Sequence, residues 1–200
     1  MKVHTLSIPG LLLIEPRDDQ DPQARFTYFF DQREFARAGL PVDFVQEHGS
    51  RYRPAGTLRG LHAQRGPGEQ IKLVRVANGR VNDVVVDVRQ GSPTFGRHET
   101  VELSAANRRM LLVPVGLAHG FCTLEPDTEV VFRLTNYNDR ETQCGLLWND
   151  PALGIDWPCG DEPAHIFDMD RHWPTLADYP PAFRFPAQPT TVPRADASPD

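Results

Sequence analysis

Four groups of residues in this sequence could carry chemistry. They are Arg59 and His62 in "TLRGLH", Lys72 and Asp83 in the valine-rich stretch that follows, His119 in "AHGF", and Asp170 in "DMDRHWP". Histidine titrates near neutral pH and therefore suits proton transfer. A charged lysine or aspartate is costly to bury unless it is paired. Together these residues predict a polar site in the interior of the protein.

The stretch "KLVRVANGRVNDVVVDV" predicts how Lys72 and Asp83 meet. Apolar residues alternate on both sides of Asn78-Gly79, a dipeptide typical of two-residue turns, so we expect a β-hairpin. In that register Lys72 and Asp83 share one face of the sheet with valines. The alternative is a shifted register that leaves Lys72 in solvent.

Arg59 and His62 are three residues apart, so they would point to opposite faces of a regular strand. Gly60 lies between them and could permit a bulge that turns both side chains inward. A single strand histidine is more often a hydrogen-bonded structural residue, and this interpretation stays open for His62 and for His119.

Short β-like segments dominate the rest of the chain. We predict strands at residues 11–15, 24–30, 42–48, 57–63, 71–77, 80–88, 98–103, 108–114, 118–124, 129–135 and 144–148, and a short helix at 31–39. This pattern predicts an all-β fold, an antiparallel jelly roll (double-stranded β-helix) whose interior can hold a small ligand. Residues 1–180 would form a single domain, and residues 181–200 a Pro-rich C-terminal tail or an arm lying on a partner.

The composition limits the classes of partner. The chain has 200 residues and a formal net charge of −6, with dispersed Lys and Arg, which argues against binding to nucleic acid or to a membrane surface. A few arginines could still bind a phosphorylated small molecule. Three cysteines without CxxC spacing and the absence of a signal-like segment predict a cytoplasmic protein with reduced thiols.

A metal site is the main alternative for the histidines, because a β-barrel with histidines could be a metal-dependent cupin. Such a site needs several converging His and carboxylate ligands. Here His62-Ala63-Gln64 is followed by Glu69, so one histidine of the expected pair is missing. We therefore predict neither a metal nor another cofactor.

Several motifs in this sequence resemble those of the dTDP-4-dehydrorhamnose 3,5-epimerases of deoxysugar biosynthesis. The matching stretches are "LRGLH" (58–62), "KLVRVANGRVNDVVVDVR" (72–89), "GSPTFG" (91–96), "VELSAANRRMLLVPVGLAHGF" (101–121), "TNYN" (135–138) and "WNDPALGIDWP" (148–158). The resemblance implies a cupin-like, metal-free jelly roll, usually a homodimer that exchanges N-terminal strands. It also implies an isomerase that acts on a nucleotide-linked 4-keto-6-deoxyhexose.

The resemblance assigns roles to the first candidates. His62 would remove a proton next to the C4 ketone, and Asp170, with Asp168 as a nearby rival, would orient it. Lys72 would stabilise the enolate oxygen that forms. The resemblance also implies that Asp83 and His119 complete the polar lining of the site. Arg59 would hold a phosphate or the sugar.

One catalytic position departs from the family pattern. The tyrosine that commonly returns a proton to the opposite face aligns with Phe132, which has no proton to give. Loss of a positioned acid typically costs about 10²–10⁴ in rate. We therefore expect inversion at one centre, C3 or C5, more readily than at both. Tyr137, Cys122 or a water molecule are possible substitutes for the acid.

Nucleotide-binding positions depart as well. The family's "RGxFxE" pattern reads "QARFTYF" here, which retains Phe26 as a group that could stack on a base. A second stacking tyrosine aligns with Asn138. The family's "QDNHS" segment reads "QEHGS", which keeps Gln46 but places His48 and Gly49 at altered positions. Nucleotides other than dTDP therefore fit these residues about as well.

Two further functions stay compatible with the sequence. The retained His62, Lys72 and Asp170 could serve an enolising isomerase or lyase that acts on a related ketosugar. The chain could also be a non-catalytic nucleotide-sugar-binding relative of the enzymes.

Overall fold

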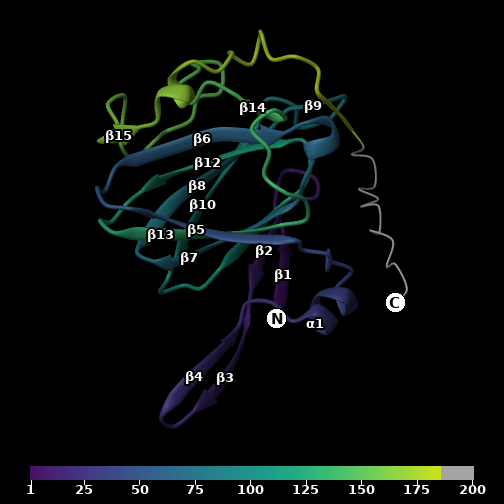
Figure 1. Ribbon diagram of the computed structural model, residues 1–200, viewed down its shortest axis with the longest axis vertical. Helices are drawn as coiled ribbons and strands as arrows, with labels where there is room; N and C mark the ends of the chain where they lie inside the picture. The colour runs from purple at the N-terminus through teal and green to yellow at the C-terminus, as the bar shows by residue number, and fades with distance from the viewer. Residues whose placement is uncertain (186–200) are drawn as a thin grey trace, which may run out of the picture.

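Two large β-sheets face each other in the computed structural model, which describes residues 1–185 (Figure 1). Within these residues the first sheet has six strands, in the order β1 (Lys2–Thr5), β2 (Leu12–Glu15), β11 (Met110–Val113), β7 (Lys72–Asn78), β13 (Thr128–Leu134) and β5 (Gln46–Tyr52). The second runs β10 (His98–Ser104), β8 (Arg80–Asp87), β12 (Leu117–Thr123), β6 (Thr57–Gln64) and β14 (Gln143–Gly145), and β15 (His165–Ile166) also pairs with β6. The predicted all-β jelly roll is confirmed.

Smaller elements flank the sandwich. They are a hairpin of β3 (Arg17–Asp21) and β4 (Ala24–Tyr28), helix α1 (Gln32–Arg37), the 3₁₀ helices η1 (Gly66–Gly68) and η2 (Asp168–Arg171), and β9 (Arg89–Gln90) paired with β16 (Phe183–Arg184). The β3–β4 hairpin projects away from the two sheets (Figure 1). Helix α1 forms where the sequence predicts it, because the Asp31 side chain accepts hydrogen bonds from the first free backbone N–H groups and Phe35 is buried.

Consecutive strands β7 and β8 lie in opposite sheets, so the predicted hairpin around Asn78-Gly79 is wrong. Strand β7 pairs with β11 and β13, whereas β8 pairs with β10 and β12. Gly79 has a positive φ of 76°, and a Cβ there would lie 2.4 Å from Thr128 Oγ1, so this corner requires glycine. The alternating pattern does not distinguish a hairpin from a corner between two facing sheets. Lys72 and Asp83 therefore share the interior, but from opposite sides of it.

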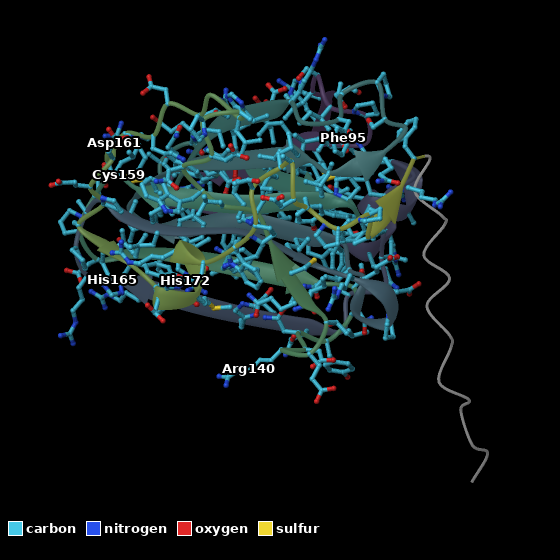
Figure 2. The ribbon with its side chains drawn as sticks, turned by 90° about the horizontal axis from the view of Figure 1, so that it is seen from above. Phe95, Arg140, Cys159, Asp161, His165 and His172 are labelled. Atoms are coloured by element: carbon cyan, nitrogen blue, oxygen red, sulfur yellow. The ribbon has the colours of Figure 1, made fainter. Side chains whose placement is uncertain are left out.

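The apolar core has three clusters, one of which surrounds Phe35 of helix α1, while the other two cover the two faces of the second sheet. Between the sheets, valines of β7 and β8 pack with Leu103, Leu111, Phe121 and Val130. On the outer face of the second sheet, Val84 and Val86 of β8 pack with residues that follow β14 in the chain, among them Leu146, Trp148 and Trp157. Seen from above, the segment that carries Cys159, His165 and His172 lies over this sheet, on the side away from Phe95 (Figure 2). The second sheet is therefore buried on both faces, which explains its nearly continuous apolar strands.

The C-terminal segment joins this outer layer. Phe183 is buried, and β16 runs parallel to β9, so the first residues of the predicted tail are paired with the domain. Residues 186–200 of that predicted tail lie outside the described residues. Among residues 1–185, the structure contains no helix of the length and apolarity that a membrane crossing requires.

Candidate active site

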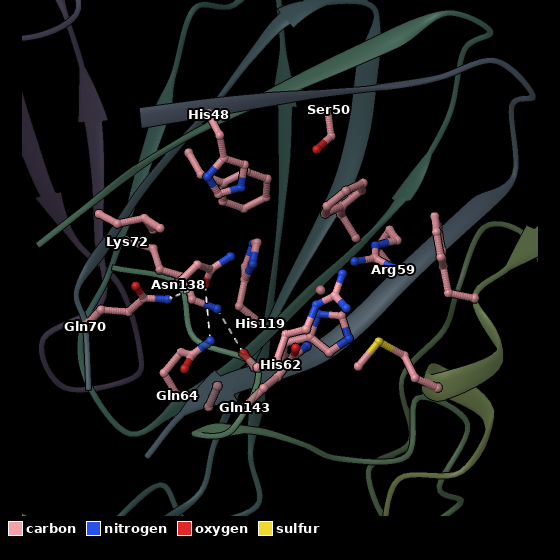
Figure 3. Close-up of a pocket in the computed structure, with 18 of the residues that line it drawn as sticks. His48, Ser50, Arg59, His62, Gln64, Gln70, Lys72, His119, Asn138 and Gln143 are labelled. Atoms are coloured by element: carbon pink, nitrogen blue, oxygen red, sulfur yellow. Dashed lines mark hydrogen bonds between the residues drawn. The ribbon is translucent and has the colours of Figure 1, made fainter. Parts of the chain in front are cut away.

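A cavity of about 620 Å³ lies between the two sheets. Strand β5 contributes His48 and Ser50 on one side, and β6 contributes Arg59 and His62 on the other (Figure 3). The full lining is His48, Ser50, Tyr52, Arg59, His62, Ala63, Gln64, Gln70, Lys72, His119, Gly120, Phe121, Phe132, Leu134, Asn138, Arg140, Gln143, Phe167, Met169 and Trp173. The fold thus brings most of the predicted site residues together in one space.

His62 is fixed by a buried carboxylate. Its Nε2 lies 2.5 Å from Oδ1 of Asp170, which is fully buried at the start of the C-terminal segment. Burial lowers the pKa of His62 below its usual range, although Asp170 opposes that shift. Burial alone would raise the pKa of Asp170, but the His62 and Gly60 hydrogen bonds and the charge of Arg59 outweigh it and leave that pKa low. The pair is therefore a carboxylate and a neutral imidazole, whose Nδ1 can accept a proton.

The structure places Asp170 on His62, and not its predicted rival Asp168. Asp168 is exposed, and its backbone carbonyl accepts a hydrogen bond from His172 Nδ1. Asp170 is one of the buried residues of η2, and its Oδ2 accepts a hydrogen bond of 3.1 Å from the backbone N–H of Gly60. Asp170 thereby connects the C-terminal segment to the strand that carries His62.

A bulge at Gly60 turns Arg59 and His62 to the same side of β6. Across the two strands His62 pairs with His119, and Arg59 pairs with Phe121. The first pair is three residues from the second on β6 but only two residues on β12, so β6 contains one extra residue, which forms a bulge. Gly60 has a φ of 114°, and a Cβ there would lie 2.5 Å from the Cα of Gly120. The expectation that Gly60 allows both side chains to point inward is met by this geometry.

Lys72 enters the cavity from the opposite sheet. It is 9% exposed, and its Nζ donates a hydrogen bond of 3.0 Å to the backbone carbonyl of His62 (Figure 3). Burial lowers the pKa of Lys72 to about 8, and the nearby carboxylate of Asp83 only partly opposes this. Lys72 is therefore mostly protonated at neutral pH, and the alternative of a solvent-exposed Lys72 is wrong.

Asp83 and His119 form a second buried pair. His119 Nε2 lies 2.9 Å from both carboxylate oxygens of Asp83, which is fully buried. Burial raises the pKa of Asp83, while the His119 contact and the charge of Lys72 work against this. Because Asp83 lies behind His119 and outside the cavity lining, it acts on the cavity through His119.

Phe132 occupies the wall opposite His62. On β13, its ring stacks on His48 of the neighbouring strand β5, with centroids 5.2 Å apart, and meets His119 edge-on at 5.9 Å. Its ring can pack against a sugar but can donate no proton. The strand expected at 42–48 begins and ends later than predicted, since β5 runs from Gln46 to Tyr52. Its alternate side chains, His48, Ser50 and Tyr52, line the cavity.

Arg59 lies at the rim near the C-terminal segment. Its guanidinium stacks on the ring of Phe167 at 3.8 Å, and Nη1 lies 3.7 Å from Asp170 Oδ2. The sequence offered no signal for Phe167, Met169 and Trp173, because their place in the cavity depends on how the C-terminal segment folds back.

The three predicted nucleotide-binding residues have different locations. Asn138 lines the cavity, where its Oδ1 accepts hydrogen bonds from Gln64 and Gln70. Gln46 does not line the cavity but accepts a hydrogen bond from the Asn138 backbone N–H at 2.9 Å. Phe26 is also absent from this cavity and is 56% exposed on the projecting β3–β4 hairpin.

Within residues 1–185, no group of three or more His, Cys, Asp or Glu side chains is placed to hold a metal ion. The site instead combines a neutral imidazole oriented by a carboxylate with a buried ammonium group from the facing sheet. This combination can remove a proton from a carbon next to a carbonyl and stabilise the negative oxygen that forms.

Comparison with known proteins gives a consistent result. Residues 5–178 match the family described as dTDP-4-dehydrorhamnose 3,5-epimerase. An enzyme of that name from Pseudomonas aeruginosa is 44% identical over 179 residues, which cover 89% of this chain and 97% of the relative.

Two solved structures are also similar. The epimerase RmlC from Legionella pneumophila, in complex with dTDP-4-keto-L-rhamnose, has a TM-score of 0.85 and 34% identity, and covers 93% of this chain and 99% of its own. ChmJ, a 3′-monoepimerase from Streptomyces bikiniensis in complex with dTDP-quinovose, has a TM-score of 0.80 and 35% identity, and covers 87% of both chains. The chain accordingly belongs to the dTDP-4-dehydrorhamnose 3,5-epimerase family.

Proposed function

We propose that this isomerase inverts a carbon beside the C4 ketone of a nucleotide-linked 4-keto-6-deoxyhexose, with His62 as the base. One observation carries the proposal. His62, hydrogen-bonded to the fully buried Asp170, shares a cavity with Lys72 from the facing sheet. A base and a fixed positive charge in one interior are the two groups that enolisation needs.

The first step moves one proton and one charge. His62 Nδ1 takes the proton from C3 or C5, and the electron pair of the broken C–H bond delocalises onto the C4 oxygen. Asp170 stabilises the imidazolium that forms, while Lys72 stabilises the enolate oxygen. The low pKa of Asp170 keeps it ionised for this role, and the low pKa of His62 keeps its imidazole free to accept the proton.

The substrate class follows from family membership and from the cavity. Relatives of solved structure hold dTDP-4-keto-L-rhamnose or dTDP-quinovose. Arg59, Gln46 and Asn138 remain the candidates for binding the nucleotide side, with Arg59 as a donor to phosphate. Phe132 favours inversion at a single centre, and ChmJ, a relative described as a 3′-monoepimerase, is a precedent for a single inversion in this fold.

A homodimer completes this proposal. Phe26 and Tyr28 are exposed on the hairpin that projects from the sandwich, and Phe26 lies outside its own chain's cavity. A second copy would cover this hairpin and bring Phe26 to a nucleotide. All three cysteines are free thiols, which supports the predicted cytoplasmic location.

The test follows hydrogen exchange and inversion in one sample. We expect dTDP- or another nucleoside diphosphate 4-keto-6-deoxyhexose, incubated in D₂O, to gain deuterium at C3 or C5 with inversion in the NMR spectrum. His62→Ala should lower exchange about 10⁴-fold, the upper range for a positioned base, with an unchanged circular dichroism spectrum.

Other outcomes point to other functions. Exchange without inversion would indicate an enolising isomerase or lyase, and binding without exchange would indicate a non-catalytic relative. Unaltered exchange in folded His62→Ala would exclude His62 as the base. Metal analysis of the purified active protein tests the prediction that no metal takes part.

A further inference from the structure

The inference concerns the proton that completes inversion, and it rests on the function proposed above. His62 reaches the substrate from the second sheet, so the returning proton comes from the facing wall, formed by β7, β13 and β5. Phe132 on β13 cannot supply it. The donor is therefore another group on that wall or a water molecule held there, since Lys72 is already assigned to the enolate oxygen.

His48 is the group beside Phe132. The two residues are cross-strand partners, and their rings stack with centroids 5.2 Å apart and an interplanar angle of 18°. His48 enters the cavity from above in Figure 3, on the side opposite His62. His48 and Phe132 thus line the cavity side by side.

His48 also differs from the other two histidines that line the cavity. His62 is hydrogen-bonded to Asp170 and His119 to Asp83. Among the contacts of the described residues, His48 makes no side-chain hydrogen bond, and its ring is held by stacking alone. Both ring nitrogens thus remain available to a substrate. Burial and the charge of Lys72 lower the pKa of His48, so less of it is protonated at neutral pH, but the protonated form is a stronger acid.

The other candidate donors are placed less well. Tyr137 is 64% exposed and does not line the cavity. Cys122 is fully buried in the outer core layer, away from the cavity. Tyr52 lines the cavity, but it lies four residues along β5 from His48, the cross-strand partner of Phe132. Its ring packs edge-on against Phe121. His48 is the donor that directly contacts Phe132.

We propose that His48 is a second catalytic residue, which delivers a proton to the face of the carbon opposite His62. His62 takes the proton from one face and becomes an imidazolium, and the electron pair passes to the C4 oxygen. Protonated His48 then gives its N–H proton to the other face, the ketone re-forms, and His48 becomes neutral. Afterwards His62 releases a proton to water and His48 takes one up, so the cycle has no net change in protons.

The experiment separates exchange from inversion in D₂O. His48→Phe keeps a ring that can stack on Phe132 but has no proton, and His48→Gln is a second, smaller change. In both variants we expect inversion to fall about 10²-fold or more, whereas deuterium exchange with retained configuration stays within about threefold of wild type. Exchange stays visible because His62 is 16% exposed and can trade its proton with solvent. Glu47→Gln, an exposed change beside His48, is the matched control for strand β5.

A rescue variant makes the test specific. Phe132→Tyr places a hydroxyl beside His48, so the double variant Phe132→Tyr with His48→Phe should recover at least tenfold of the lost inversion. Unchanged inversion in both His48 variants would overturn the proposal, as would a parallel loss of exchange and inversion or a failed rescue in a folded double variant. Loss of inversion in Tyr52→Phe with the His48 variants unaffected would make Tyr52 the donor instead. Absence of exchange in the wild type would overturn the proposed function itself.

Discussion

The two walls of the cavity are built by different interactions. On the second sheet, His62 and His119 are each hydrogen-bonded to a fully buried aspartate. On the first sheet, His48 and Phe132 hold each other by ring stacking. The wall with the hydrogen-bonded pairs keeps the residue types that the family resemblance assigns to proton removal. The stacked wall holds two of the positions at which this chain departs from that pattern, His48 and Phe132.

The two kinds of interaction differ in what their loss costs the fold, so substitutions are tolerated better on the stacked wall. Removing one partner from a buried, charged pair leaves a group without its hydrogen bond, which costs about 3–5 kcal/mol. An aromatic pair contributes only about 0.5–1.5 kcal/mol beyond its buried area. A substitution at position 48 or 132 therefore disturbs the fold less than one at position 83 or 170.

The largest effect that we expect in this comparison comes from Asp170→Asn. The amide cannot hold His62 in the tautomer that accepts a proton, nor stabilise its imidazolium, so deuterium exchange should fall about 10³-fold. Asp168→Asn, an exposed change on the same 3₁₀ helix, is the matched control and should keep wild-type exchange. The reverse result would restore Asp168 as the partner of His62.

An intermediate effect is expected at the bulge that shapes the paired wall. Gly60→Ala would place a Cβ 2.5 Å from the Cα of Gly120 and force φ = 114° on alanine, so the free energy of unfolding should fall by about 3 kcal/mol. Gly39→Ala also has a positive φ, but its Cβ would meet nothing within 4 Å, so about 1 kcal/mol is expected. Equal losses in urea titrations would show that the close contact with β12 is unimportant.

The smallest effect concerns Lys72, the buried ammonium group that the first sheet brings into the cavity. Lys72→Met should slow exchange about 10²-fold, because the enolate loses its positive partner. In the wild type, Lys72 is protonated below its pKa of about 8 and neutral above it, so exchange should decline as pH rises through about 8.

The pH profile of Lys72→Arg sharpens that test. A guanidinium stays charged far above pH 8, so the alkaline decline should disappear even if the overall rate is lower. On the acid side, exchange should decline only below the usual histidine range, since burial lowers the pKa of His62. An alkaline decline near pH 8 that persists in Lys72→Arg would assign it to another group.

Much of this site was predictable from residue types and spacing. Most strands of the two large sheets, the inward turn of Arg59 and His62 at Gly60, and the burial of Lys72 and Asp83 follow from alternation and from the position of one glycine. Strands β1 and β3 were not predicted. The pairing of β7 and β8 was not predictable, because an Asn-Gly corner and alternating valines suit two facing sheets as well as a hairpin. Ser50 and Tyr52 were missed because β5 extends beyond the expected end at residue 48. His48 was recognised only as an altered position of the family pattern, because the sequence does not show that it stacks on Phe132. Phe167 and Trp173 were missed because a distant segment brings them to the cavity.

Strand β5 lies at the end of its sheet, where β13 is its partner. A terminal strand can change its sequence without re-pairing any interior strand, and seven consecutive residues, Gln46–Tyr52, contribute every β5 side chain of the cavity. Recombination between relatives within this short stretch could therefore replace His48, Ser50 and Tyr52 together while Phe132 on β13 stays in place. His62 on β6, Lys72 on β7 and Asp170 on η2 lie outside the stretch and would pass through such an exchange unchanged.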